Sequence, residues 1–407
     1  MASVAWRPDD ALMRESNVAR FMAAEQLVDF KTLLRRSIND PEWFWDAVVR
    51  FLDLHHEGDH IVLDTSRGIP WAKWFVGSRW NVAVNCVDDY PPEQTAIVYE
   101  DEAGTTRSLT GAELRSLTDK IAWALESRGV GKGDAVGLFM PMIPETVAAL
   151  FAIAKLGAVF LPIFSGYGAD AVAVRLEDAE AVAMITADGF PRRGRIVPMK
   201  EIADAAADRV KSMHTTLLVR TGRTDPPIHE SRDVLLDSLT TREFSARALD
   251  SEHPLFIAYT SGTTGRPKGA VHVHAGFLVK IAEEVAFQTD LRPGERLFWL
   301  TDIGWIMGPW EIIGTLANRG TLVLYDGAPD FPEPDRLWSI VERHAVNVLG
   351  VSPTLVRALM VHGDAPVLEH DLSSLRILAS TGEPWNEAPW RWYFDVVGGG
   401  RCPVINI

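Results

Sequence analysis

The chain has 407 residues, of which 47% are hydrophobic and 23% are charged, a composition that suits a globular protein of two or three structural units and excludes a disordered or fibrous one. The formal net charge of −15 gives no general attraction for nucleic acid, and the two distant cysteines, Cys86 and Cys402, exclude a disulfide framework or a cysteine-based zinc site. We expect a cytoplasmic protein without a signal peptide, because no basic and then apolar segment opens the chain.

The first 86 residues form a leader that is rich in tryptophan. Aromatic side chains bury large areas and commonly cover another surface of the same protein. Residues 41–51 place apolar side chains at helical spacing behind a proline, which predicts a helix. The leader therefore reads as a packing lid without chemistry of its own. Its tryptophans are Trp6, Trp43, Trp45, Trp71, Trp74 and Trp80.

From about residue 87, short apolar segments alternate with helical ones. Thr110 followed by Glu113 is a capping box, which predicts that a helix begins there. The alternation predicts an α/β fold with mainly parallel sheet covered by helices on both faces. The polar, acidic interval 221–253 is expected to be a surface excursion. The expected strands are residues 96–99, 135–139, 159–163, 183–186, 216–219, 255–259, 321–325, 346–351 and 375–380.

The apolar segment 140–164 is long enough to suggest a membrane span. It contains charged residues and Pro162, however, and its character changes at Gly157. Residues 144–157 have helical character, and the residues after Gly157 form a short β-rich run. We therefore predict a buried helix followed by a buried strand, and no association with a membrane.

The most informative segment follows the expected strand 255–259 and reads Thr-Ser-Gly-Thr-Thr-Gly-Arg-Pro-Lys-Gly over residues 260–269. Glycines let the backbone approach a ligand, hydroxyls and backbone N–H groups form a nest for an anion, and Lys268 adds a positive charge. A Walker A loop is excluded, because Pro267 precedes the lysine and Gly269 stands where Ser or Thr is required. The segment predicts a holder for polyphosphate. Its expected contact residues are Thr260, Ser261, Gly262, Thr263, Thr264, Gly265 and Lys268.

This loop resembles the phosphate-binding motif of the adenylate-forming superfamily, which includes acyl-CoA synthetases, luciferase and peptide-synthetase adenylation domains. The resemblance covers essentially the whole chain and implies the layered α/β fold of the large N-terminal domain of that superfamily. It also implies that a carboxylate attacks the α-phosphate of ATP to give acyl-adenylate and pyrophosphate, after which the CoA thiolate displaces AMP. The implied cofactors are ATP, CoA and Mg²⁺.

Two other stretches carry the resemblance further. Residues 381–384, Thr-Gly-Glu-Pro, are similar to the adenine-side turn of the superfamily, so that Gly382, Glu383 and Pro384 would line the base. The leader is similar to the N-terminal extension of acetyl-, propionyl- and acetoacetyl-CoA synthetases. The resemblance therefore implies an extension at residues 1–86 and an AMP-binding domain at 87–407.

Residues 164–167 and 192–195 match the positions where acetyl-CoA synthetases contact CoA. The two arginines of the second segment suit a nucleotide 3′-phosphate, because each can donate charge-assisted hydrogen bonds. A solvated basic turn stays open as the alternative for these arginines. The implied CoA-binding residues are Phe164, Ser165, Gly166, Arg192 and Arg195.

The implied acyl pocket departs from the acetyl-CoA synthetase pattern. Residues 304–310 read Gly-Trp-Ile-Met-Gly-Pro-Trp where those enzymes usually have Gly-Trp-Val-Thr-Gly-His, so Met307 replaces a threonine, and Asp330 stands where an asparagine is usual. Pocket shape separates short acids by only ~1–3 kcal/mol per methylene, so an acid other than acetate stays open. The implied pocket residues are Trp305, Ile306, Met307 and Thr381.

The resemblance also implies that functional segments follow Ile407. In the superfamily these segments carry an aromatic that stacks on adenine, the glutamate that holds Mg²⁺, and a small C-terminal domain with the lysine for adenylation. We therefore expect no complete catalytic set and no metal ligands within these 407 residues, with Lys268 as a phosphate contact only, and a chain of weak or no overall activity.

The leading hypothesis is an acid–thiol ligase that converts acetate or a similar short-chain carboxylate, ATP and CoA to acyl-CoA, AMP and pyrophosphate. Small molecules are its expected partners. Two alternatives stay open. The acid could be acetoacetate or a branched acid, or the chain could be a nucleotide-binding remnant without catalysis.

Overall fold

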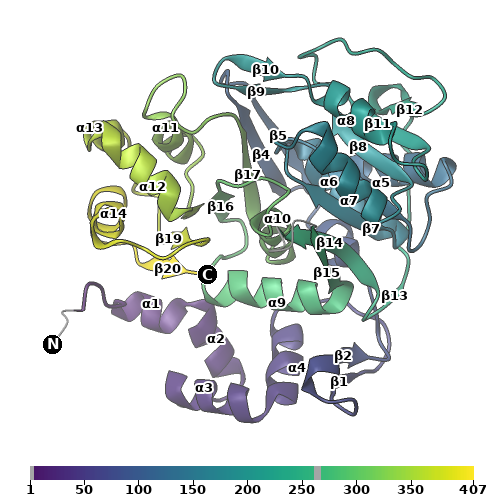
Figure 1. The fold of residues 1–407 in the computed structure, drawn as a ribbon. Coiled ribbons are helices and arrows are strands. Elements are labelled where there is room, and N and C mark those ends of the chain that lie inside the picture. The colour runs from purple at the N-terminus through teal and green to yellow at the C-terminus, as the bar shows by residue number, and fades with distance from the viewer. Residues whose placement is uncertain (1–3, 261–266) are drawn as a thin grey trace.

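The computed structural model describes residues 4–260 and 267–407, and in this part of the chain two seven-stranded sheets form the body (Figure 1). The first sheet runs in the order β12 (Asp233–Leu235), β11 (Thr215–Val219), β8 (Ala183–Ala187), β6 (Ala135–Phe139), β7 (Val159–Ile163), β14 (Pro254–Thr260) and β15 (Lys268–Val273). The second runs in the order β20 (Val404–Asn406), β19 (Ile377–Ser380), β18 (Val348–Val351), β16 (Arg296–Trp299), β17 (Thr321–Asp326), β4 (Thr95–Asp101) and β5 (Thr106–Thr110).

Within each sheet the neighbouring strands are parallel except at one edge. β15 is antiparallel to β14 in the first sheet, and β5 is antiparallel to β4 in the second. Helices connect the parallel strands, since a parallel connection must cross over the sheet. The predicted α/β fold with mainly parallel sheets is confirmed.

The helices cover both sheets and separate them from the leader. Those beside the first sheet are α5 (Gly111–Ser127), α6 (Pro144–Leu156), α7 (Ala169–Asp178) and α8 (Met199–Ala207). Those that follow it in the chain are α9 (His274–Phe287), α10 (Met307–Ala317), α11 (Arg336–Arg343), α12 (Pro353–Leu359), α13 (Ala365–Leu368) and α14 (Glu387–Trp392). In Figure 1, α9 runs across the middle of the molecule, between the sheets above and the leader below.

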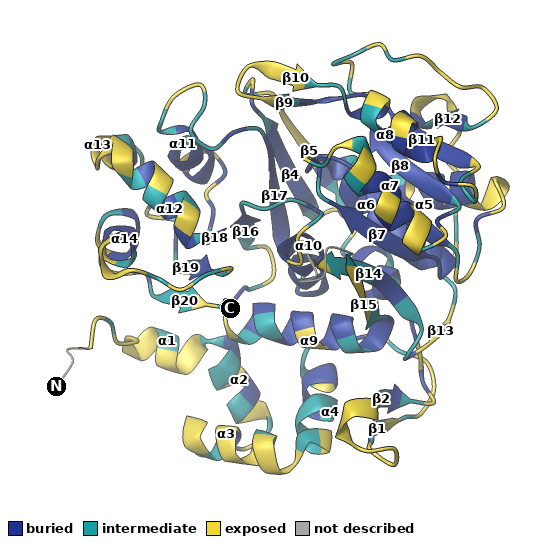
Figure 2. Ribbon diagram, viewed as in Figure 1, coloured by how far each residue is buried: buried dark blue, intermediate teal, exposed yellow. Residues whose placement is uncertain are grey.

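The apolar segment at residues 140–164 is the buried helix and strand that its sequence predicted. α6 is buried at every position except Glu145, and β7 is buried along its whole length (Figure 2). Lys155, the cation of this segment, is fully buried and paired with two aspartates. In the described residues, no helix has the length and apolar character that crossing a membrane requires.

The leader packs against α9 through aromatic side chains. It contains α1 (Asp10–Glu15), α2 (Asn17–Ala24), α3 (Phe30–Asn39), α4 (Pro41–Phe51), β1 (Ile61–Asp64), β2 (Lys73–Val76) and β3 (Arg79–Trp80). The ring of Phe21 is fully buried and lies 5.1 Å from the ring of Phe287 in α9. Trp71 is an exception to the expected covering role, because 64% of it is exposed.

Several elements differ from the sequence-based expectation. The interval 221–253 is not only a surface excursion, because β12 pairs in parallel with β11 and forms the edge of the first sheet. The strands expected at 346–351 and 375–380 begin two residues later than predicted, at Val348 and Ile377. The structure also contains elements that were not predicted: β5, β15, β16, β20, α9 and α10.

Candidate active site

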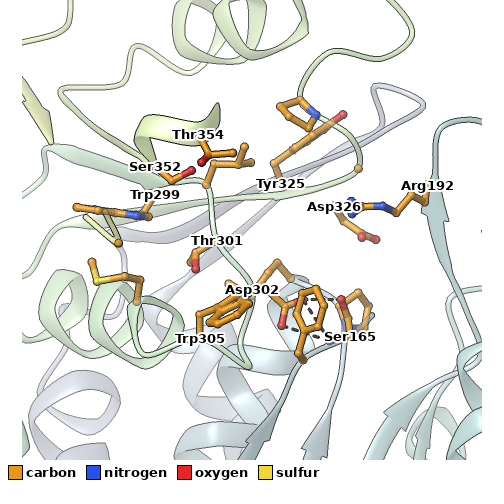
Figure 3. Close-up of a pocket in the computed structure, with 18 of the residues that line it drawn as sticks. Ser165, Arg192, Trp299, Thr301, Asp302, Trp305, Tyr325, Asp326, Ser352 and Thr354 are labelled. Carbon is orange, nitrogen blue, oxygen red and sulfur yellow. Dashed lines mark hydrogen bonds between the residues drawn. The ribbon is translucent and has the colours of Figure 1, made fainter. Parts of the chain in front are cut away.

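A cavity of about 590 Å³ lies beyond the C-terminal ends of strands from both sheets (Figure 3). Most of its lining residues lie at or after the ends of β6 and β7 of the first sheet and of β16, β17, β18 and β19 of the second. Ligands of open parallel sheets bind in such crevices, outside the carboxyl ends of the strands. The fold therefore places polar loop residues from distant parts of the chain around one space.

This cavity brings together residues from three of the groups that the sequence analysis assigned to separate ligands. Three of the implied CoA-binding residues line it, together with all four residues of the implied acyl pocket and two of the adenine-side turn. The lining members of these groups are Phe164, Ser165, Arg192, Trp305, Ile306, Met307, Thr381, Gly382 and Glu383. Gly166, Arg195 and Pro384 are not among the lining residues.

The implied phosphate loop is described only at its two ends. Thr260 ends β14 and faces Lys268, the first residue of β15, across the antiparallel pair. Both residues are exposed. The other predicted contacts, Ser261, Gly262, Thr263, Thr264 and Gly265, lie outside the described residues.

Aromatic side chains form one wall of the cavity. The ring of Phe164 lies 5.4 Å from that of Tyr167 and 5.6 Å from that of Trp305. Gly304 lets the two loops come this close, because a Cβ atom at position 304 would lie 2.1 Å from the backbone nitrogen of Phe164. A glycine is therefore required where the second sheet approaches the end of β7.

Asp302 joins the two sheets at the cavity and was missed by the sequence analysis. Its carboxylate accepts hydrogen bonds from the hydroxyl and the backbone N–H of Ser165 and from the backbone N–H of Gly304, at 2.8 Å (Figure 3). Burial raises the pKa of Asp302 to about 6, against the lowering effect of these bonds. The available signal was its place directly after β16, but that strand was not predicted.

Two further buried acids lie in or beside the cavity wall. Burial raises the pKa of Asp326 to about 7, although the guanidinium of Arg223 lies 2.6 Å from it and opposes the shift. In Figure 3 the side chain of Arg192 points toward Asp326. Glu311 of α10 is fully buried, which raises its pKa well above its usual range; one oxygen accepts the backbone N–H of Trp299, and the other has no partner among the described residues.

The adenine-side turn presents backbone rather than charge to the cavity. Glu383 accepts hydrogen bonds from the hydroxyl of Thr354 and from the guanidinium of Arg357, the latter at 2.6 Å. These bonds, that of Thr354 first, lower the pKa of Glu383. The two bonds fix the carboxylate of Glu383 at the edge of the cavity.

Within residues 4–260 and 267–407, no group of three or more His, Cys, Asp or Glu side chains could hold a metal ion. Both cysteines are free and buried.

Residues 85–407 match the model of the AMP-binding enzyme family. The chain belongs to this family. Residues 30–86 match a second model, the acetyl-coenzyme A synthetase N-terminus. The family assignment agrees with the resemblance of the phosphate loop and the adenine-side turn, and with a binding cavity at the strand ends.

Individual relatives are similar over nearly the whole chain. An acetyl-coenzyme A synthetase of Deinococcus radiodurans is 40% identical over 98% of this chain and 63% of its own length. Acetyl-coenzyme A synthetase 2 of Pseudomonas aeruginosa is 38% identical over 93% of this chain and 60% of its own. The solved structure of an acetoacetyl-CoA synthetase from Streptomyces lividans superposes with a TM-score of 0.91 at 29% identity, covering 100% of this chain and 64% of that one. The chain thus spans about 52–63% of the length of these curated relatives.

Proposed function

We propose that this chain binds ATP, CoA and a short carboxylic acid and carries the large domain of an enzyme that forms acyl-CoA through an acyl-adenylate. The observation that carries the proposal is the shared cavity, which gathers the adenine-side turn, the acyl wall and the CoA-side residues around one space of about 590 Å³. A reaction that joins three substrates in succession needs such an arrangement, because holding reactants together supplies a large part of the barrier reduction. The printed names of the relatives agree with this reading.

In this proposal the chain's own residues bind the substrates and orient their reacting groups. The turn at 382–384 receives the adenine, and Thr260 and Lys268 flank the loop for the phosphates. Trp305, Ile306 and Met307 present an apolar wall to the reacting carboxyl group. Mg²⁺, when bound, would neutralise charge on the phosphates.

An acid larger than acetate is the favoured substrate. The wall implied for the acyl group is apolar, because Trp305, Ile306 and Met307 line it and Met307 replaces the threonine that is usual in acetyl-CoA synthetases. Such a wall suits acetoacetate or a branched acid better than the two-carbon acetate, since an apolar pocket rewards each buried methylene.

The test is carboxylate-dependent exchange of pyrophosphate into ATP by the purified protein, with acetate, propionate, acetoacetate and isobutyrate. Exchange that is fastest with acetoacetate or isobutyrate is the expected result. Exchange fastest with acetate would keep the ligase function and overturn the larger acid. Absence of ATP binding by the protein would overturn the proposed function.

Two variants sharpen this experiment. Met307→Thr is expected to shift the preference toward acetate, because it changes the acyl wall toward the residue usual in acetyl-CoA synthetases. Val361→Ala is the matched control, since Val361 is 81% exposed and is not among the residues lining the cavity. An unchanged preference in Met307→Thr would remove Met307 from the acyl pocket.

A further inference from the structure

The β9–β10 hairpin, which carries the two implied CoA arginines, is short and lies apart from both sheets (Figure 1). β9 (Phe190–Arg192) and β10 (Arg195–Val197) form a two-stranded antiparallel ribbon of three residues each. A ribbon of this size is marginal in water without support from other elements. Its position must therefore be fixed by contacts from elsewhere in the chain.

The hairpin places two positive charges opposite each other. Arg192 and Arg195 are directly paired across the ribbon, so their side chains share one face, and both residues are exposed. Neither makes an ion pair or a side-chain hydrogen bond with the described residues. Like charges in this arrangement repel, and a doubly charged phosphate between them would relieve the repulsion.

The two-residue turn of the hairpin is strained and needs support. Arg193 and Gly194 both have positive φ, +51° and +72°. Glycine adopts this conformation freely, whereas an arginine does so only where its surroundings compensate the strain. The turn therefore depends on the residues that contact it.

Two carboxylates that follow strands of the second sheet hold this turn. The carboxylate of Glu102, which follows β4, accepts the backbone N–H groups of Arg193 at 2.9 Å and Gly194 at 2.6 Å. Asp330, which follows β17, accepts from one guanidinium nitrogen of Arg193 with both carboxylate oxygens, at 2.8 and 2.9 Å. A Cβ atom at position 194 would lie 3.1 Å from the ring of Phe331.

We propose that Asp330 and Arg193 act as positioning residues, which hold Arg192 and Arg195 in place as the receptor for the 3′-phosphate of CoA. This inference rests on the proposed function, because it takes CoA as the ligand. The proposal explains two features that the resemblance to CoA-binding segments does not explain. One is an acidic residue, Asp330, next to a site for an anion, and the other is an arginine in a turn that favours glycine. Asp330 neutralises Arg193 and directs it away from the phosphate, so that the other two arginines remain available.

The direction in which Asp330→Asn changes CoA binding distinguishes a positioning role from simple electrostatic attraction. Asp330→Asn removes a negative charge near the phosphate, so attraction alone predicts tighter binding of CoA. Loss of the clamp predicts the opposite, weaker recognition of the phosphate. Arg193→Gly is the second variant; it removes the same ion pair and is expected to fold at least as well, because glycine tolerates the positive φ.

The experiment is calorimetric titration of the protein with CoA and with 3′-dephospho-CoA, which differ only in the phosphate. The unchanged protein is expected to bind CoA more tightly, and both variants are expected to reduce this preference about fivefold, the effect of an exposed ion pair near the upper end of its usual range. Binding of dephospho-CoA should not change. Asp170→Asn is the control, since it removes the partner of Arg209 in an exposed ion pair away from the hairpin.

The outcomes separate this inference from the proposed function. A preference for CoA that is kept or increased in Asp330→Asn would overturn the clamp and leave CoA binding intact. Equal binding of CoA and dephospho-CoA by the unchanged protein would remove the phosphate site itself, and the clamp with it.

Discussion

Charged side chains are buried in two regions of this protein, and the two regions differ in whether these side chains have partners of opposite charge. Behind the first sheet, the ammonium of Lys155 lies 2.6 Å from a carboxylate oxygen of Asp88 and 2.6 Å from one of Asp119, with the carbonyl of Phe244 at 3.2 Å. At the cavity, Asp302 is half-buried, and behind the lining residue Trp299 the side chain of Glu311 is fully buried; neither acid has a cation within ion-pair distance in the described part of the chain.

Buried charges with partners of opposite charge stabilise the fold, whereas buried charges without such partners lower its stability. A buried ion whose partners surround it is compensated, although burial still raises the pKa of Asp88 against the opposing charge of Lys155. An uncompensated buried carboxylate favours its neutral form, and perturbed acids of this kind gather at functional sites. The two acids of the cavity fit the second description, and Asp326, which has Arg223 as a partner, stands between the two.

The largest effect is expected from breaking the compensated cluster. Lys155→Met would leave Asp119 buried without a cation and would leave Asp88 with Arg115 alone, at 3.4 Å, which should lower the free energy of unfolding by about 3–5 kcal/mol. Denaturant unfolding measures this loss. Lys211→Met, at an exposed position, should stay within about 0.5 kcal/mol of the unchanged protein. A loss below about 1 kcal/mol in Lys155→Met would show that the cluster does not stabilise the fold.

The second effect is a dependence of the unfolding free energy on pH that arises from Asp326. Its carboxyl has a pKa of about 7 in the folded protein and about 4 when unfolded, so the folded state holds the proton more tightly. Its contribution to stability is therefore complete below pH 4 and is lost as the pH rises through 7. Between these values the unchanged protein should lose stability relative to Asp326→Asn, by at most about 4 kcal/mol. Parallel curves of unfolding free energy against pH would contradict the raised pKa.

The smallest effect is expected from an ion pair at the edge of the cavity that is not buried. Arg357 and Glu383 are 2.6 Å apart, but their side chains are 36% and 33% exposed. Arg357→Met should therefore cost less than about 1 kcal/mol in unfolding free energy. The same measurement as for Lys155→Met then compares a buried with an exposed cation directly, and equal losses would show that burial is not what distinguishes the two clusters.

The elements that were predicted well are those with a strong local pattern. The strands at 135–139 and 159–163 and the helix at 41–51 have the predicted bounds, and the Thr110–Glu113 capping box is present. α9 and α10 were not predicted, because each is buried on most sides and lacks the polar stripe that marks a surface helix. β20 is only three residues long, too short to give a periodic signal.

The residues of the candidate site likewise fall into those that were predicted from the sequence and those that were not. The residues that resemble known motifs, at 164–166, 305–307 and 381–383, were identified from the chain itself. Asp302, Asp326 and Glu311 were not, because a single acid carries no motif. The importance of such an acidic residue depends on its own burial and on its hydrogen-bond partners from distant segments, such as Ser165 for Asp302.

The sequence by itself determined the α/β class and predicted the kind of ligand, because hydrophobic periodicity and a glycine-rich anion loop are local properties. Only the tertiary structure decided that the CoA-side, acyl and adenine-side residues share one cavity, since they follow strands of two different sheets. It also decided which buried charges have partners. Asp88 and Lys155 are 67 residues apart, and Arg193 and Asp330 are 137 apart. Spatial proximity over such separations is fixed by the packing of the sheets and helices.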